Sequence, residues 1–454
     1  LRLERTPDIE GATDPDYIMW GDYGTSAEFA TASQEFTALS RQLNGAKLNY
    51  NFGDLQISAL YSQGGQAFQR DTLLPDGTSG FYFLTQRLVV PGSEEVYFEL
   101  EELERPGTII WRDRLFRGQD YEIDYDRGSI VFNDPVLRTE IGDNGEILVR
   151  RIVVTYQNES GEDNKVYAGR LRYHFNRDPG QASWIGATYF REDQGERDLE
   201  IYGVDAQIHL GENYKFIGEY AQSQNSSAEL GNVSGSAYRF ELDAKFADGF
   251  TGRAYYRHAD TGFANRSTIS FVPGQTRYGV DLNAQLSPST QLRFNYDHEK
   301  NQGVNIRPIV TLGDLINAGQ EGIPTGLVDN ELTTITAGLA QRFGKANLNV
   351  DLLFRDRLDY LNPENDGSST QLRTNFTTPL SDRLKLRLLN QTTLSAESDA
   401  VFSDRSQIGL DWKIAQGVNL NLNQNWYHSG TLAGQSTTSI GFTGEYKPWH
   451  NTIL

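Results

Sequence analysis

The clearest pattern of apolar and polar residues lies between Thr334 and Arg355, where the two kinds alternate on either side of Gly344-Lys345. Side chains on a strand point alternately to its two faces, so this pattern predicts two strands, each with one apolar and one polar face. Only Gln341 and Leu353 break the alternation. Each limb has about 10 residues, the length that a tilted strand needs to cross a bilayer.

A single hairpin of this kind also occurs in soluble β-sandwiches, but here the alternation recurs along most of the chain. It appears on both sides of Gly53-Asp54, and it continues from Asn164 almost to the end of the sequence. Further alternating segments are 46–52, 55–61, 167–175, 204–210, 238–246, 278–286, 292–296, 384–388, 408–414 and 418–426. Repetition on this scale favours one large barrel.

The predicted connections between these strands alternate between tight and long. The tight ones are 211–213, 247–249, 287–289, 344–345, 381–382 and 416–417. The long ones are 222–236, 260–275, 300–330, 359–369, 395–404 and 429–435. Outer-membrane barrels have this arrangement, with short periplasmic turns and longer extracellular loops. The longest connection, Lys300–Asn330, is expected to be a lid, a binding loop or a constriction, with a helical turn at 314–317.

We therefore predict an all-β fold: an antiparallel transmembrane β-barrel of roughly 16–18 strands with a small inserted β-domain. Residues 1–16 are expected to be an irregular leader, 17–76 the first barrel strands, 77–157 the inserted domain and 158–454 the remaining strands. Tyr17–Phe29 is counted as a strand. The sequence starts without a signal peptide and ends without the terminal aromatic strand typical of such barrels, so we expect a trimmed chain or a fragment.

Composition agrees with a barrel and excludes several other classes. The 454 residues are 38% hydrophobic with a mean hydropathy of −0.54, and they include no apolar run of the length a membrane helix needs. Tyrosine and phenylalanine number 23 each and glycine 44, which suits strands with aromatic girdles and tight turns. The net charge of −20 argues against a nucleic-acid partner. Cysteine is absent, which is compatible with export.

The sequence contains only weak signals for catalytic or metal-binding groups. None of the six histidines has a metal-ligand spacing, and a lipase-type role for His258 is much less favoured than an interfacial histidine. The glutamates of Glu94–Glu104 suggest calcium, but they alternate within predicted strands instead of forming a calcium loop, so a solvated charged face is favoured. We predict no enzymatic activity, no metal and no cofactor.

Charged residues on the polar faces of the strands are the most informative set. A barrel would place them on its inner wall, as candidate pore-lining residues. They are Arg170, Arg172, Arg239, Arg253, Arg257, Arg277, Arg293, Arg355, Arg373 and Arg387, together with Asp243, Asp281, Asp297, Asp351 and Asp411. Opposed charges on a pore wall create a transverse field that selects polar solutes. Alternatively, they are cross-strand ion pairs that only fill the interior. The sequence leaves both open.

Three motifs set residues 77–157 apart from the barrel pattern: Asp76–Leu84, Val90–Glu94 and Arg117–Tyr125. The last, RGQDYEIDY, leads through a glycine-containing turn into Ser129–Phe132, which predicts a hairpin. This segment resembles a β-module of large surface and outer-membrane proteins of Gram-negative-type bacteria, and it is similar to parts of the giant barrel translocons of gliding bacteria. The resemblance implies a repeated envelope β-domain and no particular activity.

Together these observations predict a porin-like, non-enzymatic channel for polar solutes in a bacterial outer membrane. Its partners would be the lipid bilayer and lipopolysaccharide, small polar solutes, and other envelope proteins or copies of itself. The alternative is a structural anchor for a surface layer, an appendage, or a secretion or electron-transfer assembly, with a filled lumen. Because Gly53-Asp54 is a short and therefore periplasmic turn, the long loops and the inserted domain are expected outside the cell, the domain as a cap in preference to a plug.

Overall fold

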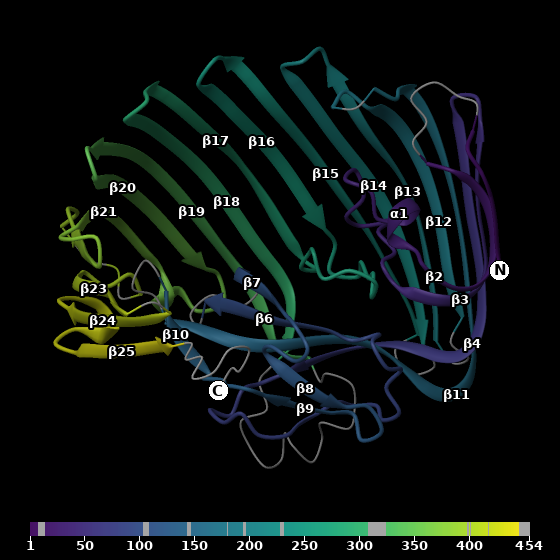
Figure 1. The fold of residues 1–454 in the computed structure, drawn as a ribbon, viewed down its shortest axis with the longest axis horizontal. Helices are drawn as coiled ribbons and strands as arrows, with labels where there is room; N and C mark the ends of the chain where they lie inside the picture. Colours follow the sequence, from purple (N-terminus) through teal and green to yellow (C-terminus); the bar gives the residue numbers. More distant parts are fainter. Residues whose placement is uncertain are drawn as a thin grey trace.

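The computed structural model describes residues 1–7, 14–102, 109–142, 147–178, 180–193, 197–227, 231–306, 324–396, 399, 401–415 and 417–444 of the chain. These residues form one 22-stranded sheet and one small 3-stranded sheet. Figure 1 shows the large sheet as a curved arc, with β1 and β25 at its two ends and the helical turn α1 (Ser26–Phe29) inside the curve. The chain is therefore all-β with a large antiparallel sheet, as the alternation predicts.

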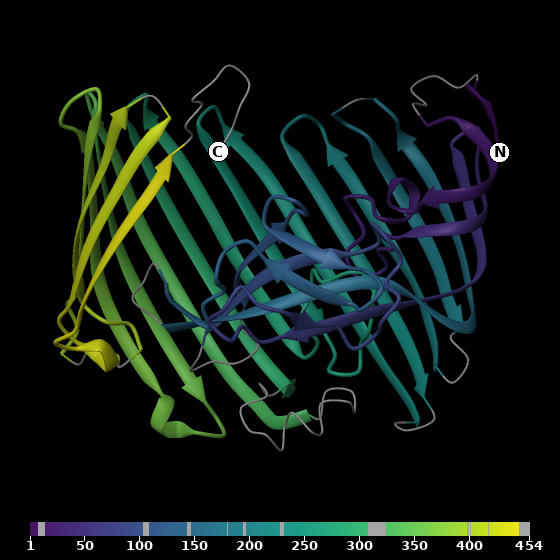
Figure 2. The ribbon, with the colours of Figure 1, turned by 60° about the horizontal axis from the view of Figure 1, so that its bottom comes forward.

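The curved wall is a row of strands in which each pairs antiparallel with the next. In order along the arc they are β1 (Arg2–Arg5), β2 (Asp16–Gly24), β3 (Gln42–Phe52), β4 (Leu55–Leu73), β11 (Ile147–Asn176), β12 (Ser183–Asp193), β13 (Arg197–Leu210), β14 (Tyr214–Ser227), β15 (Gly231–Ala247), β16 (Phe250–Ala259), β17 (Gln275–Ser287), β18 (Thr290–Ile306), β19 (Pro324–Phe343), β20 (Ala346–Asp359), β21 (Gly367–Pro379), β22 (Leu384–Thr393), β23 (Arg405–Ala415), β24 (Val418–Tyr427) and β25 (Ser436–Gly444). Figure 2 shows these strands side by side and tilted.

Tight turns join the wall strands along one edge of the arc, the turn rim. The other edge, the loop rim, carries long connections such as 25–41 and 260–274. The predicted turns at 53–54, 211–213, 247–249, 287–289 and 344–345 each join consecutive strands. Three predicted long connections are wrong in part. Residues 222–227 and 231–236 belong to β14 and β15, and residues 300–306 and 324–330 belong to β18 and β19. Residues 367–369 belong to β21. The ends of these strands are polar, and in the sequence such stretches cannot be told from loops. The helical turn expected at 314–317 lies outside the described residues.

The first residues also differ from the prediction. Arg2–Arg5 forms a short strand paired with β2, whereas residues 1–16 were expected to be irregular. Leu3 is its one apolar residue, so the sequence shows no alternation there that would signal a strand. The expected strand Tyr17–Phe29 ends at Gly24 and is followed by α1. The large sheet therefore has more strands than the roughly 16–18 expected, since β1 and three strands of the inserted segment also belong to it.

The convex face of the wall is apolar and exposed. Leu242 on β15, Phe294 on β18 and Leu352 on β20 are 40%, 40% and 43% exposed. Tyrosines on four neighbouring strands form a continuous row across this face. The ring centroids of Tyr238, Tyr256, Tyr278 and Tyr296 follow one another at 5.9, 5.8 and 6.2 Å. Tyrosine rings are amphipathic and collect where an apolar layer meets water.

The inserted segment is built on two wall strands that extend beyond the wall. β4 and β11 continue to pair through Phe68–Leu73 and Ile152–Gln157, and β11 also pairs with β6 (Glu95–Glu102) and β10 (Thr139–Ile141). The other strands here are β5 (Tyr82–Phe83), β7 (Ile109–Leu115), β8 (Tyr121–Asp124) and β9 (Ser129–Phe132). Figure 1 shows β6, β8, β9 and the first half of β11 crossing the open side of the arc.

This segment has its own apolar core, which includes Tyr82, Tyr121, Ile130, Phe132 and Tyr156. The RGQDYEIDY motif supplies the predicted hairpin, because β8 pairs with β9 across a turn that contains Gly128. A Cβ at Gly128 would lie 2.4 Å from the carbonyl oxygen of Gln86, and its φ is +63°, so only glycine fits there. The division of the chain at residues 16, 76 and 157 stays a prediction.

Three glutamates of this segment are buried and not solvated. Glu99, Glu101 and Glu102 are 4%, 3% and 5% exposed. Glu99 pairs with Arg112 at 2.6 Å, and Glu101 pairs with Arg151. The expectation of solvated carboxylates was wrong for these three, because cross-strand arginines on β7 and β11 compensate their burial. The Glu95 side chain is 38% exposed. Glu104 lies outside the described residues. No helix among the described residues is long and apolar enough to cross a membrane.

Candidate functional site: the concave face of the wall

The concave face carries the charged residues that the alternation assigned to the inside of a barrel. Most of them occur as cross-strand ion pairs. Arg170 binds Asp205 at 2.6 Å, with both side chains 1% exposed. Further pairs are Arg253–Glu241 at 3.0 Å, Arg277–Asp297 at 2.9 Å, Arg293–Asp351 at 2.9 Å, Arg373–Asp351 at 3.4 Å and Arg387–Asp411 at 2.9 Å. Asp243 lies 4.0 Å from Arg253.

The remaining predicted residues have other partners. Arg172 stacks over the ring of Trp184 at 5.5 Å, and Arg355 over the ring of Phe402 at 4.1 Å. Asp281 accepts a hydrogen bond from Asn295. Arg239 and Arg257 both contact Glu35, which does not belong to a wall strand. The structure therefore brings the predicted set together on one face, largely in pairs; whether that face lines a pore stays a prediction.

The connection between β2 and β3, residues 25–41, folds into the concave side of the wall. We call it the inner segment. Its main anchor is Glu219 on β14, whose side chain is fully buried. The Glu219 carboxylate accepts hydrogen bonds from the backbone N–H groups of Glu35, Phe36 and Thr37 at 2.7, 3.0 and 2.9 Å, and from the Thr37 hydroxyl at 2.8 Å. One wall carboxylate thus holds a whole turn of the inner segment.

Two more contacts fix the middle and the end of the inner segment. In its middle, the Ser33 hydroxyl donates to Asp205 at 2.5 Å and accepts from the indole N–H of Trp184 at 2.9 Å. At its end, the Arg41 guanidinium donates two hydrogen bonds to the Glu192 carboxylate, at 2.7 and 2.8 Å. Both side chains of that ion pair are 1% exposed. The inner segment is therefore held at several points by wall residues.

Two connections of the loop rim also fold inward. In residues 260–274, Phe263 and Phe271 pack on Phe36 of the inner segment, at ring-centroid distances of 5.7 and 5.5 Å. The side-chain amide of Asn265 donates to the carbonyl oxygens of Phe36 and Ala38 at 2.7 and 2.9 Å. In residues 394–404, Asp399 pairs with Arg357 of β20 at 3.0 Å, and both side chains are buried. These connections narrow the space inside the arc.

None of these inward folds was predicted from the sequence. The inner segment carries Thr25, Thr31, Ser33 and Thr37, which look like ordinary loop residues. The available signal was Phe29, Phe36 and Leu39, apolar residues in a polar connection, all at most 1% exposed. A solvent-exposed loop of this length is mostly polar, so three large apolar residues could have indicated a buried connection.

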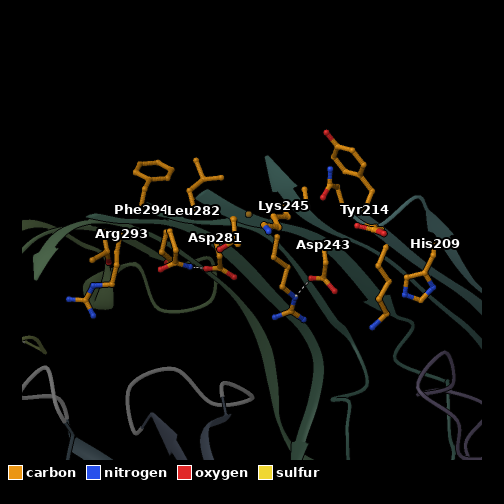
Figure 3. Close-up of a pocket in the computed structure, with 18 of the residues that line it drawn as sticks. His209, Tyr214, Asp243, Lys245, Asp281, Leu282, Arg293 and Phe294 are labelled. Carbon is orange, nitrogen blue, oxygen red and sulfur yellow. Dashed lines mark hydrogen bonds and ion pairs between the residues drawn. The ribbon is translucent and has the colours of Figure 1, made fainter. Parts of the chain in front are cut away.

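Nearer the turn rim, the concave face keeps an open cavity of about 780 Å³. It is lined from β13 to β21 by residues that include His209, Asp243, Asp281 and Arg293. Figure 3 shows these four side chains on one side of the sheet, and Tyr214, Leu282 and Phe294 on the other. The sheet therefore separates the charged and polar side chains on its concave face from the apolar and aromatic side chains on its convex face. Among the described residues, no group of three His, Cys, Asp or Glu side chains could hold a metal ion.

Comparison with known proteins gives only distant structural similarity. No family model matches the sequence, and no curated protein matches it. Similar solved structures include the ferric enterobactin receptor PfeA of Pseudomonas aeruginosa (11% identity, 96% of this chain and 73% of that chain, TM-score 0.37). They also include the FrpB iron transporter of Neisseria meningitidis (10%, 95% and 76%, 0.39) and the siderophore receptor PirA of Pseudomonas aeruginosa (12%, 96% and 81%, 0.36). At these values the likeness assigns neither a family nor a function.

Proposed function

We propose that the curved sheet is the wall of a β-barrel in a bacterial outer membrane, and that its concave face lines a passage for small polar solutes. The observation that carries this proposal is the opposite character of the two faces. Leu352 on the convex side of β20 is 43% exposed, whereas its neighbour Asp351 on the concave side is 3% exposed and paired with two arginines. A soluble protein would leave a large apolar surface in water, but lipid covers it at no cost.

The protein acts without catalysis in this proposal. The ion pairs of the concave face provide alternating charge across the passage, as in pores that select polar solutes. The inner segment and the two inward connections form its constriction. Purified protein in planar bilayers should give discrete conductance steps, and loosening the inner segment by Glu219→Ala should enlarge them. A silent bilayer with both proteins would rule out the passage.

A second candidate is a structural anchor whose lumen is filled. The buried contacts of the inner segment favour it, because a segment held by Glu219, Asp205 and Glu192 occupies space that a solute would need. In that case the barrel holds an envelope assembly at the membrane and conducts nothing. The same bilayer experiment separates the two candidates, since only the passage predicts conductance.

The two faces of β20 should respond differently to a new positive charge. Leu352→Arg places a guanidinium against lipid, which costs about 2–4 kcal/mol near the bilayer midplane. Asn349→Arg places the same group on the concave face, where Asp351 lies on the same strand and the loss should be below about 1 kcal/mol. Urea unfolding in lipid vesicles measures both. Equal losses would mean that the convex face does not meet lipid.

The loop rim and the inserted segment are proposed to face the outside of the cell. Short turns lie at the periplasmic edge of outer-membrane barrels, and the predicted tight turns that the structure describes lie on the turn rim. A protease added to intact cells should cut within residues 74–146. We expect the cut near Glu102–Pro106, a stretch that lies partly outside the described residues. Cleavage only after the outer membrane is opened would reverse the orientation or place the segment inside the barrel.

A further inference from the structure

Three arginines lie directly opposite one another on the concave face. Arg239 of β15 is in register with Arg257 of β16, and Arg257 is in register with Arg277 of β17. We call these three residues the arginine rung. Like charges opposite one another on neighbouring strands repel, so the rung is stable only when anions lie against it.

Arg257, the middle residue of the rung, takes its anion from outside the wall, and Arg239 shares that anion while also pairing with Glu219 of β14 at 3.3 Å. One oxygen of the Glu35 carboxylate, Oε2, lies 2.6 Å from Nη2 of Arg257 and 3.1 Å from Nη1 of Arg239. Glu35 belongs to the inner segment, and its side chain is 5% exposed. Its second oxygen, Oε1, is buried and has no hydrogen-bond partner among the described residues. Arg277 is paired within the wall, with Asp297 at 2.9 Å.

A cavity of about 240 Å³ lies beside the rung. Four guanidinium groups line it, from the three rung arginines and Arg253, against the carboxylates of Glu241 and Asp281. The side chains of Arg257 and Arg277 are 34% and 38% exposed, whereas that of Arg239 is 11% exposed. Solvent therefore reaches two of the rung arginines, and the charge of the lining is positive.

We propose that the arginine rung is a binding site for small oxyanions, carrying a phosphate or a carboxylate group, and that Glu35 is its internal competitor. Guanidinium groups bind both kinds of oxyanion through paired, charge-assisted hydrogen bonds. The cavity has room for inorganic phosphate or a short dicarboxylate. The inference rests on the proposed function in one respect, because it takes the concave face as the side that solutes reach.

The test measures binding of inorganic phosphate and of succinate to the purified full chain in detergent, by titration calorimetry at constant ionic strength. Glu35→Gln removes the competing charge and keeps the shape of the side chain. It also leaves the backbone contacts of the inner segment with Glu219 intact. The variant should bind the oxyanions about tenfold more tightly than the unaltered protein, as expected when an external anion no longer has to displace Glu35.

Two further variants make the test specific. Adding Arg257→Gln and Arg277→Gln to Glu35→Gln should abolish the binding. The matched control is Arg293→Gln in the same background, because Arg293 lies on the same face but outside this cavity, paired with Asp351. Binding should survive that change. If Glu35→Gln does not fold, Glu35→Asp keeps the charge, shortens its reach to the rung and should give an intermediate gain.

Equal affinity of the unaltered protein and the Glu35 variants would overturn the inference, and so would binding that survives loss of both arginines. The outcome is independent of the bilayer experiment. A protein that conducts but does not bind oxyanions at the rung contradicts this inference alone. A protein that binds them but never conducts contradicts the proposed passage and leaves the binding site in place.

Discussion

Replacing Glu219 with alanine should release the inner segment from the wall. The change removes the acceptor of three backbone N–H groups and of the Thr37 hydroxyl, and it deprives Arg239 of one of its two carboxylate partners. Breaking a buried, hydrogen-bonded charged group in this way costs about 3–5 kcal/mol. Because the wall pairings are unchanged, the loss should appear as local opening of residues 25–41 before any unfolding of the sheet.

Hydrogen exchange measures that opening directly. The amides of Glu35, Phe36 and Thr37 should exchange faster by about two orders of magnitude or more, since each 1.4 kcal/mol corresponds to a factor of ten. Glu212→Ala is the matched control, because this carboxylate is exposed in the turn before β14. It should leave the three amides protected. Unchanged exchange in the Glu219 variant would mean that other contacts alone hold the inner segment.

Arg41→Ala should be the second large destabilising change. It leaves the Glu192 carboxylate buried, with its two hydrogen bonds from the guanidinium lost. Removing one partner of a buried ion pair costs about 3–5 kcal/mol, because the remaining charge is uncompensated. Unfolding in urea, followed by the fluorescence of Trp184 and the other tryptophans, measures the loss.

A double variant separates the ion pair from simple packing. Arg41→Met combined with Glu192→Leu removes both charges and keeps much of the volume, so it should lose less stability than Arg41→Ala alone. The control pair is Arg191–Asp198, which is 43% and 40% exposed with 3.5 Å between its charged atoms. Arg191→Ala should cost less than about 1 kcal/mol. If the double variant were as unstable as Arg41→Ala, the loss of stability would come from packing and not from the unpaired charge.

The sequence predicts the wall well because strand alternation has a direct physical cause. Leu352 and Asp351 are consecutive residues and therefore point to opposite faces of β20. Leu352 is exposed and Asp351 is buried, as the alternation predicts. The tight turns are equally predictable, since Gly211 and Gly344 have φ values of +67° and +60°, a conformation that favours glycine. Strand length is less predictable, because polar strand ends at the loop rim pair through the backbone and need no apolar face.

The candidate site was predictable only in its wall residues. The alternation placed Arg239, Arg257 and Arg277 on one face, but their register and their counter-ion depend on contacts far apart in the sequence. Glu35 and Arg257 are separated by more than 200 residues in the chain and meet only because the inner segment folds back. No local pattern encodes such a contact. The burial of the glutamates in β6 was missed for the same reason, since their arginine partners lie on β7 and β11.

The central claim is that the convex face meets lipid and the concave face meets a polar interior. The chain has no cysteine, so single cysteines can be introduced along β20 and labelled with nitroxides in lipid vesicles. Collision with oxygen, which dissolves in lipid, should be high at positions 348, 350, 352 and 354 and low at 349, 351 and 353, a period of two residues. Accessibility without that period, or access of a water-soluble relaxant to position 352, would contradict the claim.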